Sequence, residues 1–103
     1  MSKVFVPSET THNITGAMKF GEIVTILPPN SQIAFSPIPT TRRIMRALES
    51  FKPDDYLLCI GDPSCIGIAC AAASEKTNGK FKMLKWDRLE KTYIPIAVDL
   101  ELS

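Results

Sequence analysis

The sequence predicts a single compact α/β domain with about five strands in a largely parallel central sheet. Short apolar segments of strand length alternate with helical segments along the chain, an order that favours parallel strands joined by crossovers. Residues 56–60 are apolar without polar alternation, which is typical of a strand buried on both faces. The last two strand segments follow each other directly and predict a C-terminal antiparallel hairpin.

The clearest local signals surround the expected strand at 56–60. Asp62 is the expected N-cap of the following helix, because its carboxylate can accept from amides of the first turn. Pro63 suits the first helical position, where no amide partner is needed. We expect this main helix at about 63–76, ending at the left-handed C-cap pair Asn78-Gly79. Its small residues predict burial along most of its length.

The other elements are less uniform. Residues 32–35 fit either a small edge strand or an ordered loop. Residues 36–39 are expected to be extended, since a residue that precedes proline is disfavoured in a helix, and Thr40 is then the expected N-cap. Pro95 places the last strand at a sheet edge or at a bulge. The remaining expected elements are strands at 3–6, 22–27, 80–86 and 93–100, a short helix at 14–20 and a first main helix at about 41–51, which makes the helix at about 63–76 the second.

Composition restricts the function classes. The 103 residues predict one domain, 1–103, and a net charge of +1 gives no bulk attraction to nucleic acid or to an anionic membrane. No segment approaches the roughly 20 apolar residues of a membrane span, and the N-terminus has no signal-peptide core. Three cysteines without paired spacing favour a reducing compartment over a disulfide framework. We therefore expect a cytoplasmic protein. One histidine cannot complete a usual zinc site with cysteines so arranged, so we expect no metal site and no cofactor.

The loop before the second main helix is the first candidate ligand site. Ser64 lies where a strand passes into a helix N-terminus, and such places bind anions in α/β sheets. The spacing matches neither the dinucleotide nor the Walker motif, and Asp62 places negative charge among the same amides. Capping by Asp62 is the favoured interpretation, and anion binding by this loop is the alternative.

The C-terminal hairpin is the second candidate. Lys85, Trp86 and Arg88 lie in its first half and Tyr93 lies opposite. Aromatic rings of this kind stack on bases, and Lys or Arg side chains bind phosphates. A packed aromatic pair with solvated charges explains the same pattern, so both interpretations stay open.

The start of the first main helix is the third candidate, with Thr40, Thr41 and Arg42. Arg42 and its neighbour Arg43 oppose the helix dipole, at a cost of a few tenths to about 1 kcal/mol each. A bound anion or an acidic partner would offset that cost. The alternative is that these long side chains extend into water.

No catalytic residues are predicted. His12 lies in a polar loop without a glycine-flanked nucleophile. Cys65 lies near a helix N-terminus, which favours a thiolate, but the nearby Asp62 opposes it. The sequence therefore favours a non-enzymatic protein and leaves a small hydrolase or transferase as an alternative.

A set of segments also supports a family resemblance, and it covers nearly the whole chain. Together these segments resemble small uncharacterised proteins of tailed phages and viral metagenomes. The resemblance implies a phage origin, and with it the host cytoplasm, but no activity and no catalytic residues. The segments are Val4-Phe5-Val6-Pro7, His12-Asn13, Phe20-Gly21-Glu22-Ile23-Val24, Pro53-Asp54-Asp55-Tyr56-Leu57-Leu58, Gly61-Asp62-Pro63, Ile66-Gly67-Ile68-Ala69, Leu84-Lys85-Trp86-Asp87-Arg88, Tyr93-Ile94-Pro95-Ile96 and Asp99-Leu100.

Two functional hypotheses follow. The first is a small phage accessory protein that binds or sequesters an anionic nucleotide-like ligand near Arg42, Lys85, Trp86 and Arg88. The second is a phage protein that binds and modulates a host protein through its last strand or hairpin.

We also expect a homo-oligomer, because the last strand is apolar along one face in so short a chain.

Overall fold

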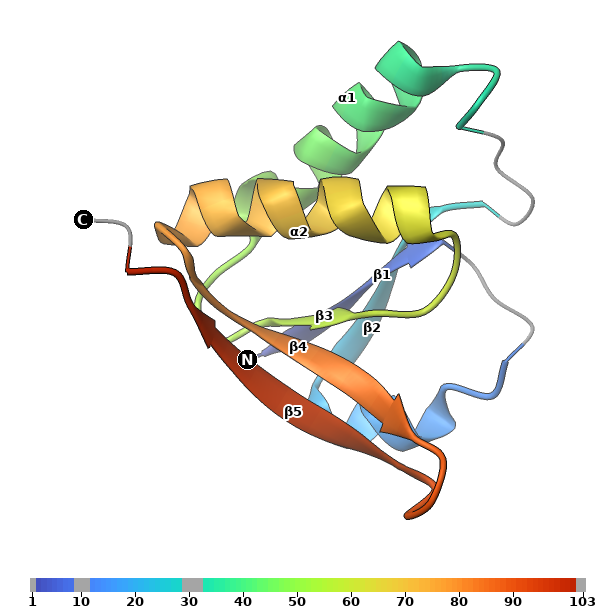
Figure 1. The fold of residues 1–103 in the computed structure, drawn as a ribbon, viewed down its shortest axis with the longest axis vertical. Coiled ribbons are helices and arrows are strands. Elements are labelled where there is room, and N and C mark those ends of the chain that lie inside the picture. The colour runs from blue at the N-terminus through green and yellow to red at the C-terminus, as the bar shows by residue number, and fades with distance from the viewer. Residues whose placement is uncertain (1, 9–11, 29–32, 102–103) are drawn as a thin grey trace.

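The computed structural model describes residues 2–8, 12–28 and 33–101, which are organised around one five-stranded sheet (Figure 1). The strand order is β2-β1-β3-β4-β5. Neighbouring strands are parallel except β4 and β5, which form an antiparallel hairpin. The predicted α/β fold with a largely parallel sheet and a C-terminal hairpin is therefore confirmed. The strands are β1 (Lys3–Ser8), β2 (Glu22–Leu27), β3 (Tyr56–Leu58), β4 (Lys80–Asp87) and β5 (Thr92–Asp99).

Helices cover both faces of the sheet. The crossover from β1 to β2 leads to one side of β1, whereas the later crossovers lead back across the sheet towards β4. Because parallel crossovers are right-handed, connections that run in opposite directions place their helices on opposite faces. Accordingly, α1 (Pro37–Ala47) and α2 (Pro63–Thr77) pack together on one face, and the short 3₁₀ helix η1 (Thr15–Phe20) packs on the other. We call these the helix face and the η1 face.

The core has one layer on each face, because successive residues of a strand point to opposite sides. Leu57 belongs to the helix-face cluster and Leu58 to the η1-face cluster, and both are fully buried. This confirms that the central strand is buried on both faces. The remaining η1-face cluster consists of Val4, Val6, Ala17, Leu84 and Tyr93.

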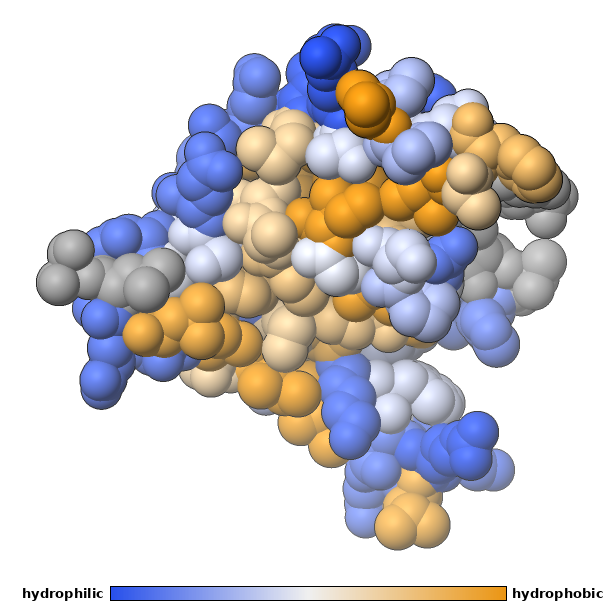
Figure 2. Space-filling view, turned by 45° about the horizontal axis from the view of Figure 1, so that its top comes forward, coloured by the Kyte–Doolittle hydropathy of each residue, from blue (hydrophilic) through white to orange (hydrophobic). Residues whose placement is uncertain are grey.

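The ends of α2 agree with the sequence. The Asp62 carboxylate accepts a hydrogen bond of 2.7 Å from the Ser64 amide, and Pro63 occupies the first helical position. Asn78 adopts a left-handed conformation at the C-cap. The prediction of burial along most of α2 is wrong, since Gly67 and Ala71 are exposed. Only one side of α2 contacts the sheet and α1, and Figure 2 shows an apolar area over this helical layer.

The first main helix begins earlier than expected. It starts at Pro37, so residues 36–39 are not extended and Thr40 is not the N-cap. Pro37 and Pro39 are tolerated because the first amides of a helix have no intrahelical partner. The Thr40 amide instead donates to the Ser36 carbonyl at 3.1 Å inside the first turn. After Ala47 the chain continues as a 3₁₀ helix, η2 (Leu48–Ser50), so the helical segment still reaches nearly to the expected end.

Of the two interpretations of residues 32–35, the structure supports the loop, since residues 33–35 form a turn, and Gln32 lies outside the described residues. Two strand boundaries differ from the prediction. β3 ends at Leu58 instead of Ile60. β1 continues through Pro7 to Ser8. Pairing between β1 and β3 stops at Phe5, so Pro7 lies beyond that ladder and its missing amide interrupts no bond to β3. Pro95 lies in the edge strand β5, as its sequence position predicts.

Asp55 joins the beginnings of β1 and β3. Its side chain is 2% exposed, and its two carboxylate oxygens accept from the amides of Lys3 and Lys52, each at 2.9 Å. The Asp55 amide also donates to the Lys52 carbonyl at 2.9 Å, which closes the turn before β3. A buried carboxylate with two amide donors is well satisfied, so this residue holds the amino ends of the two strands together.

None of the helices in the ranges 2–8, 12–28 and 33–101 is long and apolar enough to cross a membrane.

Replacement of Asp55 tests this junction. We expect Asp55→Ala to lower the free energy of unfolding by about 2–4 kcal/mol, because two partly buried amides lose a charged acceptor. The exposed neighbour provides the control, and Asp54→Ala should change stability by no more than about 0.5 kcal/mol. Urea denaturation followed by far-UV circular dichroism measures both. Equal midpoints for the two variants would contradict the assignment.

Candidate functional site

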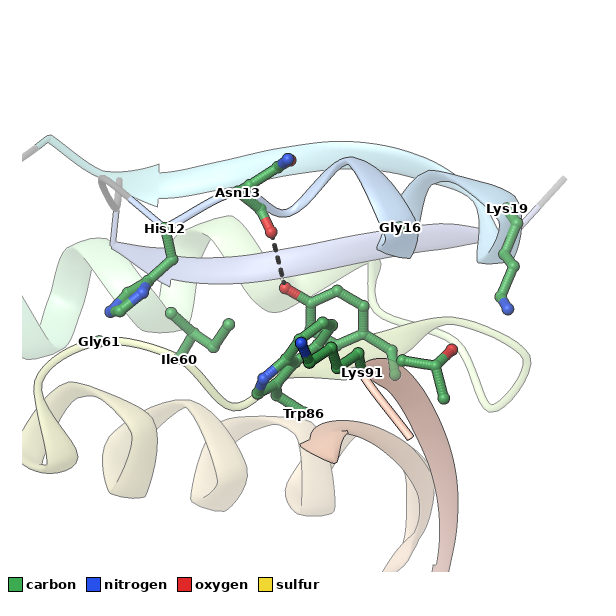
Figure 3. Close-up of a pocket in the computed structure, with 10 residues that line it drawn as sticks. His12, Asn13, Gly16, Lys19, Ile60, Gly61, Trp86 and Lys91 are labelled. Carbon is green, nitrogen blue, oxygen red and sulfur yellow. Dashed lines mark hydrogen bonds between the residues drawn. The ribbon is translucent and has the colours of Figure 1, made fainter. Parts of the chain in front are cut away.

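A cavity of about 670 Å³ opens on the η1 face at the carboxyl ends of the parallel strands (Figure 3). Its walls come from the segment after β1, from η1, from the loop after β3 and from the β4–β5 hairpin. The described lining residues are His12, Asn13, Gly16, Lys19, Ile60, Gly61, Trp86, Lys91, Thr92 and Tyr93.

The position of the cavity follows from the strand order. The chain leaves β1 towards β2 on one side and leaves β3 towards β4 on the other. Between the carboxyl ends of β1 and β3 the two connections therefore diverge, which is the topological switch point where α/β sheets bind ligands. Asn13 and Gly61 line the cavity from the segments that follow these two strands.

Two aromatic rings form the wall at the hairpin. Trp86 and Tyr93 are paired across β4 and β5, with ring centroids 4.9 Å apart in an edge-to-face arrangement. The Tyr93 hydroxyl donates a long hydrogen bond of 3.4 Å to the Asn13 carbonyl, and burial raises the pKa of this phenol. Tyr93 is 4% exposed, whereas Trp86 is 41% exposed. Tyr93 is thus fixed in the wall, and part of the Trp86 ring remains accessible.

Besides the phenol of Tyr93, the ionisable side chains of the cavity are basic. They are His12, Lys19 and Lys91, and the described lining residues include no carboxylate. His12 and Lys19 lie at opposite ends of the cavity in Figure 3. Because two lysines, Lys19 and Lys91, line the same cavity as the exposed Trp86 ring, the cavity favours an anionic ligand with an aromatic part.

Gly61 shapes the edge of the cavity. Its φ is +115°, a conformation that side chains of L-residues rarely adopt. A Cβ atom at this position would also lie 2.6 Å from the Ser8 hydroxyl oxygen. The loop after β3 can therefore pass close to the end of β1 only with glycine here.

The structure brings together two of the candidate ligand residues, Trp86 and Tyr93. Lys85 is exposed and points to the opposite face from Trp86, since neighbours in a strand alternate. Arg88 is exposed in the hairpin turn and does not line the cavity. Ser64 is exposed at the start of α2, where its amide is bonded to Asp62 as the capping interpretation predicts.

The three candidates at the first main helix lie on α1, which packs on the helix face. The Thr41 hydroxyl donates to the Pro37 carbonyl at 2.7 Å, so it is engaged within its own helix. Arg42 is exposed, and neither it nor Thr40 lines the cavity.

Sequence reasoning did not assign the cavity residues Asn13, Lys19, Gly61 and Lys91. Asn13 and Gly61 carried a usable signal, because both follow strands whose carboxyl ends meet at the switch point. Lys19 carried none, since its position depends on how η1 packs against β5.

The two residues considered for catalysis lie apart. His12 lines the cavity on the η1 face. Cys65 is 1% exposed in the helix-face cluster. Burial, and then the charge of Asp62, raises the pKa of the Cys65 thiol, so the acidic N-cap opposes a thiolate as the sequence predicts.

The other two thiols are neighbours on the helix face. Cys59 follows β3 and Cys70 lies on α2, and both are partly exposed. A hydrogen bond from Cys59 lowers the pKa of Cys70 to about 7, and the pKa of Cys59 is raised in turn by this bond and by burial. Both sulfurs also contact the Met83 sulfur.

The fold and the cavity define a small α/β protein with an aromatic, basic pocket at the switch point of a parallel sheet. Residues 2–100 match the family described as Phage Pam3 gp32-like protein, and the chain belongs to this family. The resemblance to small phage proteins is therefore confirmed. No curated protein and no solved structure matches the chain.

The thiol pair gives a pH-dependent prediction. The lowered pKa keeps Cys70 as a thiolate above about pH 7, so its alkylation by iodoacetamide should rise with a midpoint near pH 7. Cys59→Ala removes the hydrogen bond and should move this midpoint up towards about 8.5. Peptide mass spectrometry resolves each cysteine, and buried Cys65 serves as the slow internal control. A wild-type midpoint near 8.5 would contradict the pairing.

Proposed function

We propose that this phage protein binds an anionic, nucleotide-like ligand in the cavity on the η1 face. The observation that carries the proposal is the 41% exposed Trp86 ring in a cavity with basic and without acidic described lining residues. The ring would stack on a base, and Lys19 and Lys91 would contact phosphate groups.

The size and the energies fit this ligand class. A cavity of about 670 Å³ lies within the range of roughly 300–1,000 Å³ that small-molecule sites occupy. Stacking of a base on an aromatic side chain contributes about 1–3 kcal/mol. Tyr93 holds Trp86 from behind through the edge-to-face contact, which reduces the side-chain freedom lost on binding.

The proposed role is binding rather than turnover. The described lining residues supply no thiol or carboxylate that could act as a nucleophile, and Cys65 belongs to the other face. Sequestration of a nucleotide in the host cytoplasm suits a small phage protein of this kind. A hydrolase or transferase that used covalent catalysis would need such a nucleophile beside His12.

Calorimetry against mono-, di- and cyclic nucleotides tests the proposal. At least one of them should bind the wild type, and Trp86→Ala should weaken that binding by about 10-fold or more. Lys91→Ala should weaken it and reduce its salt dependence. Lys85→Ala is the matched control, because it removes a cation from the same strand on the opposite face and should leave affinity unchanged. No binder at millimolar concentration, or equal losses for Lys85→Ala and Trp86→Ala, would overturn the proposal.

A second candidate is binding of a host protein through the hairpin. It is favoured by the position of β5 at the sheet edge and by Leu89, which is 91% exposed at the hairpin turn. Oligomerisation through the same strand stays a prediction.

Pull-down from host lysate tests the second candidate. A stoichiometric partner should be captured by the wild type and lost with Leu89→Ser. Phe35→Ser removes a similarly exposed apolar side chain elsewhere and should retain the partner. Retention by the Leu89 variant would exclude the hairpin as the docking surface.

A further inference from the structure

Three sulfur atoms converge on the helix face, away from the cavity. The Sγ atom of Cys59 lies 3.5 Å from the Sδ atom of Met83, and the Sγ atom of Cys70 lies 3.9 Å from the same atom. Cys59 directly follows β3, Cys70 lies in the middle of α2 and Met83 lies in the middle of β4. We propose that Cys59, Cys70 and Met83 form a binding site for a soft monovalent metal ion, Cu(I).

The spacing fits trigonal coordination. An ion about 2.3 Å from each of three sulfurs in one plane places those sulfurs about 4 Å apart. The two distances to Met83 are close to that value, so a rotation of the side chains would suffice. No group of three His, Cys, Asp or Glu side chains suited to a metal occurs among the described residues. A site here therefore depends on the thioether as its third ligand.

The ligand set selects the ion. Two thiolates and a thioether are soft donors, which prefer Cu(I) and related ions to Mg²⁺, Ca²⁺ or Mn²⁺. Structural Zn²⁺ sites use four Cys or His ligands, and this cluster offers two of them. Binding of Cu(I) by two thiolates and a neutral thioether leaves a net charge of −1 and releases up to two thiol protons, without any redox step.

The cluster is both accessible and fixed. Cys59, Cys70 and Met83 are each partly exposed, in contrast to the buried Cys65. Met83 lies in β4 between β3 and β5 and is paired in register with Leu57 and Ile96. Cys70 is the eighth residue of α2, a 15-residue helix that is capped at both ends. Cys59 directly follows β3, and its amide is fixed by a hydrogen bond of 3.1 Å to the Leu84 carbonyl, so the backbone of all three residues is held in place.

The alternative is a thiol pair that packs against a thioether without any metal function. Met83→Leu separates the two possibilities, because it keeps the volume of the side chain and removes only the sulfur. Cys65→Ser removes the one cysteine outside the cluster and provides the matched control.

Competition against bicinchoninate under anaerobic, reducing conditions tests the site, with Cu(I) and redox-inert Ag(I) as probes. The wild type should bind one equivalent of either ion. Cys59→Ser and Cys70→Ser should each lower affinity by about 100-fold or more, and Met83→Leu by about 10-fold or more. Cys65→Ser should bind as the wild type does. X-ray absorption of the Cu(I) protein should show three sulfur neighbours.

Thermal unfolding of each apo-variant shows that it remains folded, and X-ray absorption on the wild type needs no variant. Wild-type affinity in Met83→Leu, or two sulfur neighbours instead of three, would overturn the three-sulfur site. Loss of binding in Cys65→Ser, or no stoichiometric uptake by the wild type, would also overturn it.

Discussion

The buried carboxylate of Asp55 is the interaction on which the rest of the arrangement depends. It accepts from Lys3 at the beginning of β1 and from Lys52 in the turn before β3, and so joins segments 52 residues apart. With their amino ends held together, β1 and β3 become neighbours in the centre of the sheet. β3 contributes only three residues to the ladder, so a side-chain bond of this strength matters more here than beside a long strand.

The cavity is a consequence of that neighbour relation. If β1 and β3 are adjacent, the chain must leave them in opposite directions, because β2 occupies one side and β4 the other. Right-handed crossovers then separate η1 from the two main helices. η1 is only six residues long and contacts β1, β2 and β5, so the segment after β3 and Trp86 near the end of β4 are left to line the cavity. The hairpin closes the far side with Trp86 and Tyr93.

The sequence was sufficient for most of the fold and for little of the site. The caps of α2, the edge position of Pro95 and the two-sided burial of β3 follow from local rules that packing does not override. The start of α1 was predicted wrongly because the steric bias against helix before proline is only a preference, and the missing amides of Pro37 and Pro39 interrupt no intrahelical bond in a first turn. The site residues come from four separated segments. Trp86 and Tyr93 were found because they pair within one hairpin, whereas Lys19 depends on the packing of a short helix.

The short length of β3 also explains why the cavity and the cluster of sulfur atoms lie on either side of one strand end. The Cys59 amide makes the last hydrogen bond to β4, to the Leu84 carbonyl. The Ile60 amide instead donates to the Leu58 carbonyl, so the chain turns away from the sheet at this point. Three successive residues then serve both faces, with Cys59 among the sulfurs of the helix face and Ile60 and Gly61 in the wall of the cavity. A strand two residues longer would continue the alternation of side chains and would remove the turn that brings Gly61 close to Ser8. The early end of the central strand is therefore what gives this small sheet room for a site at its switch point.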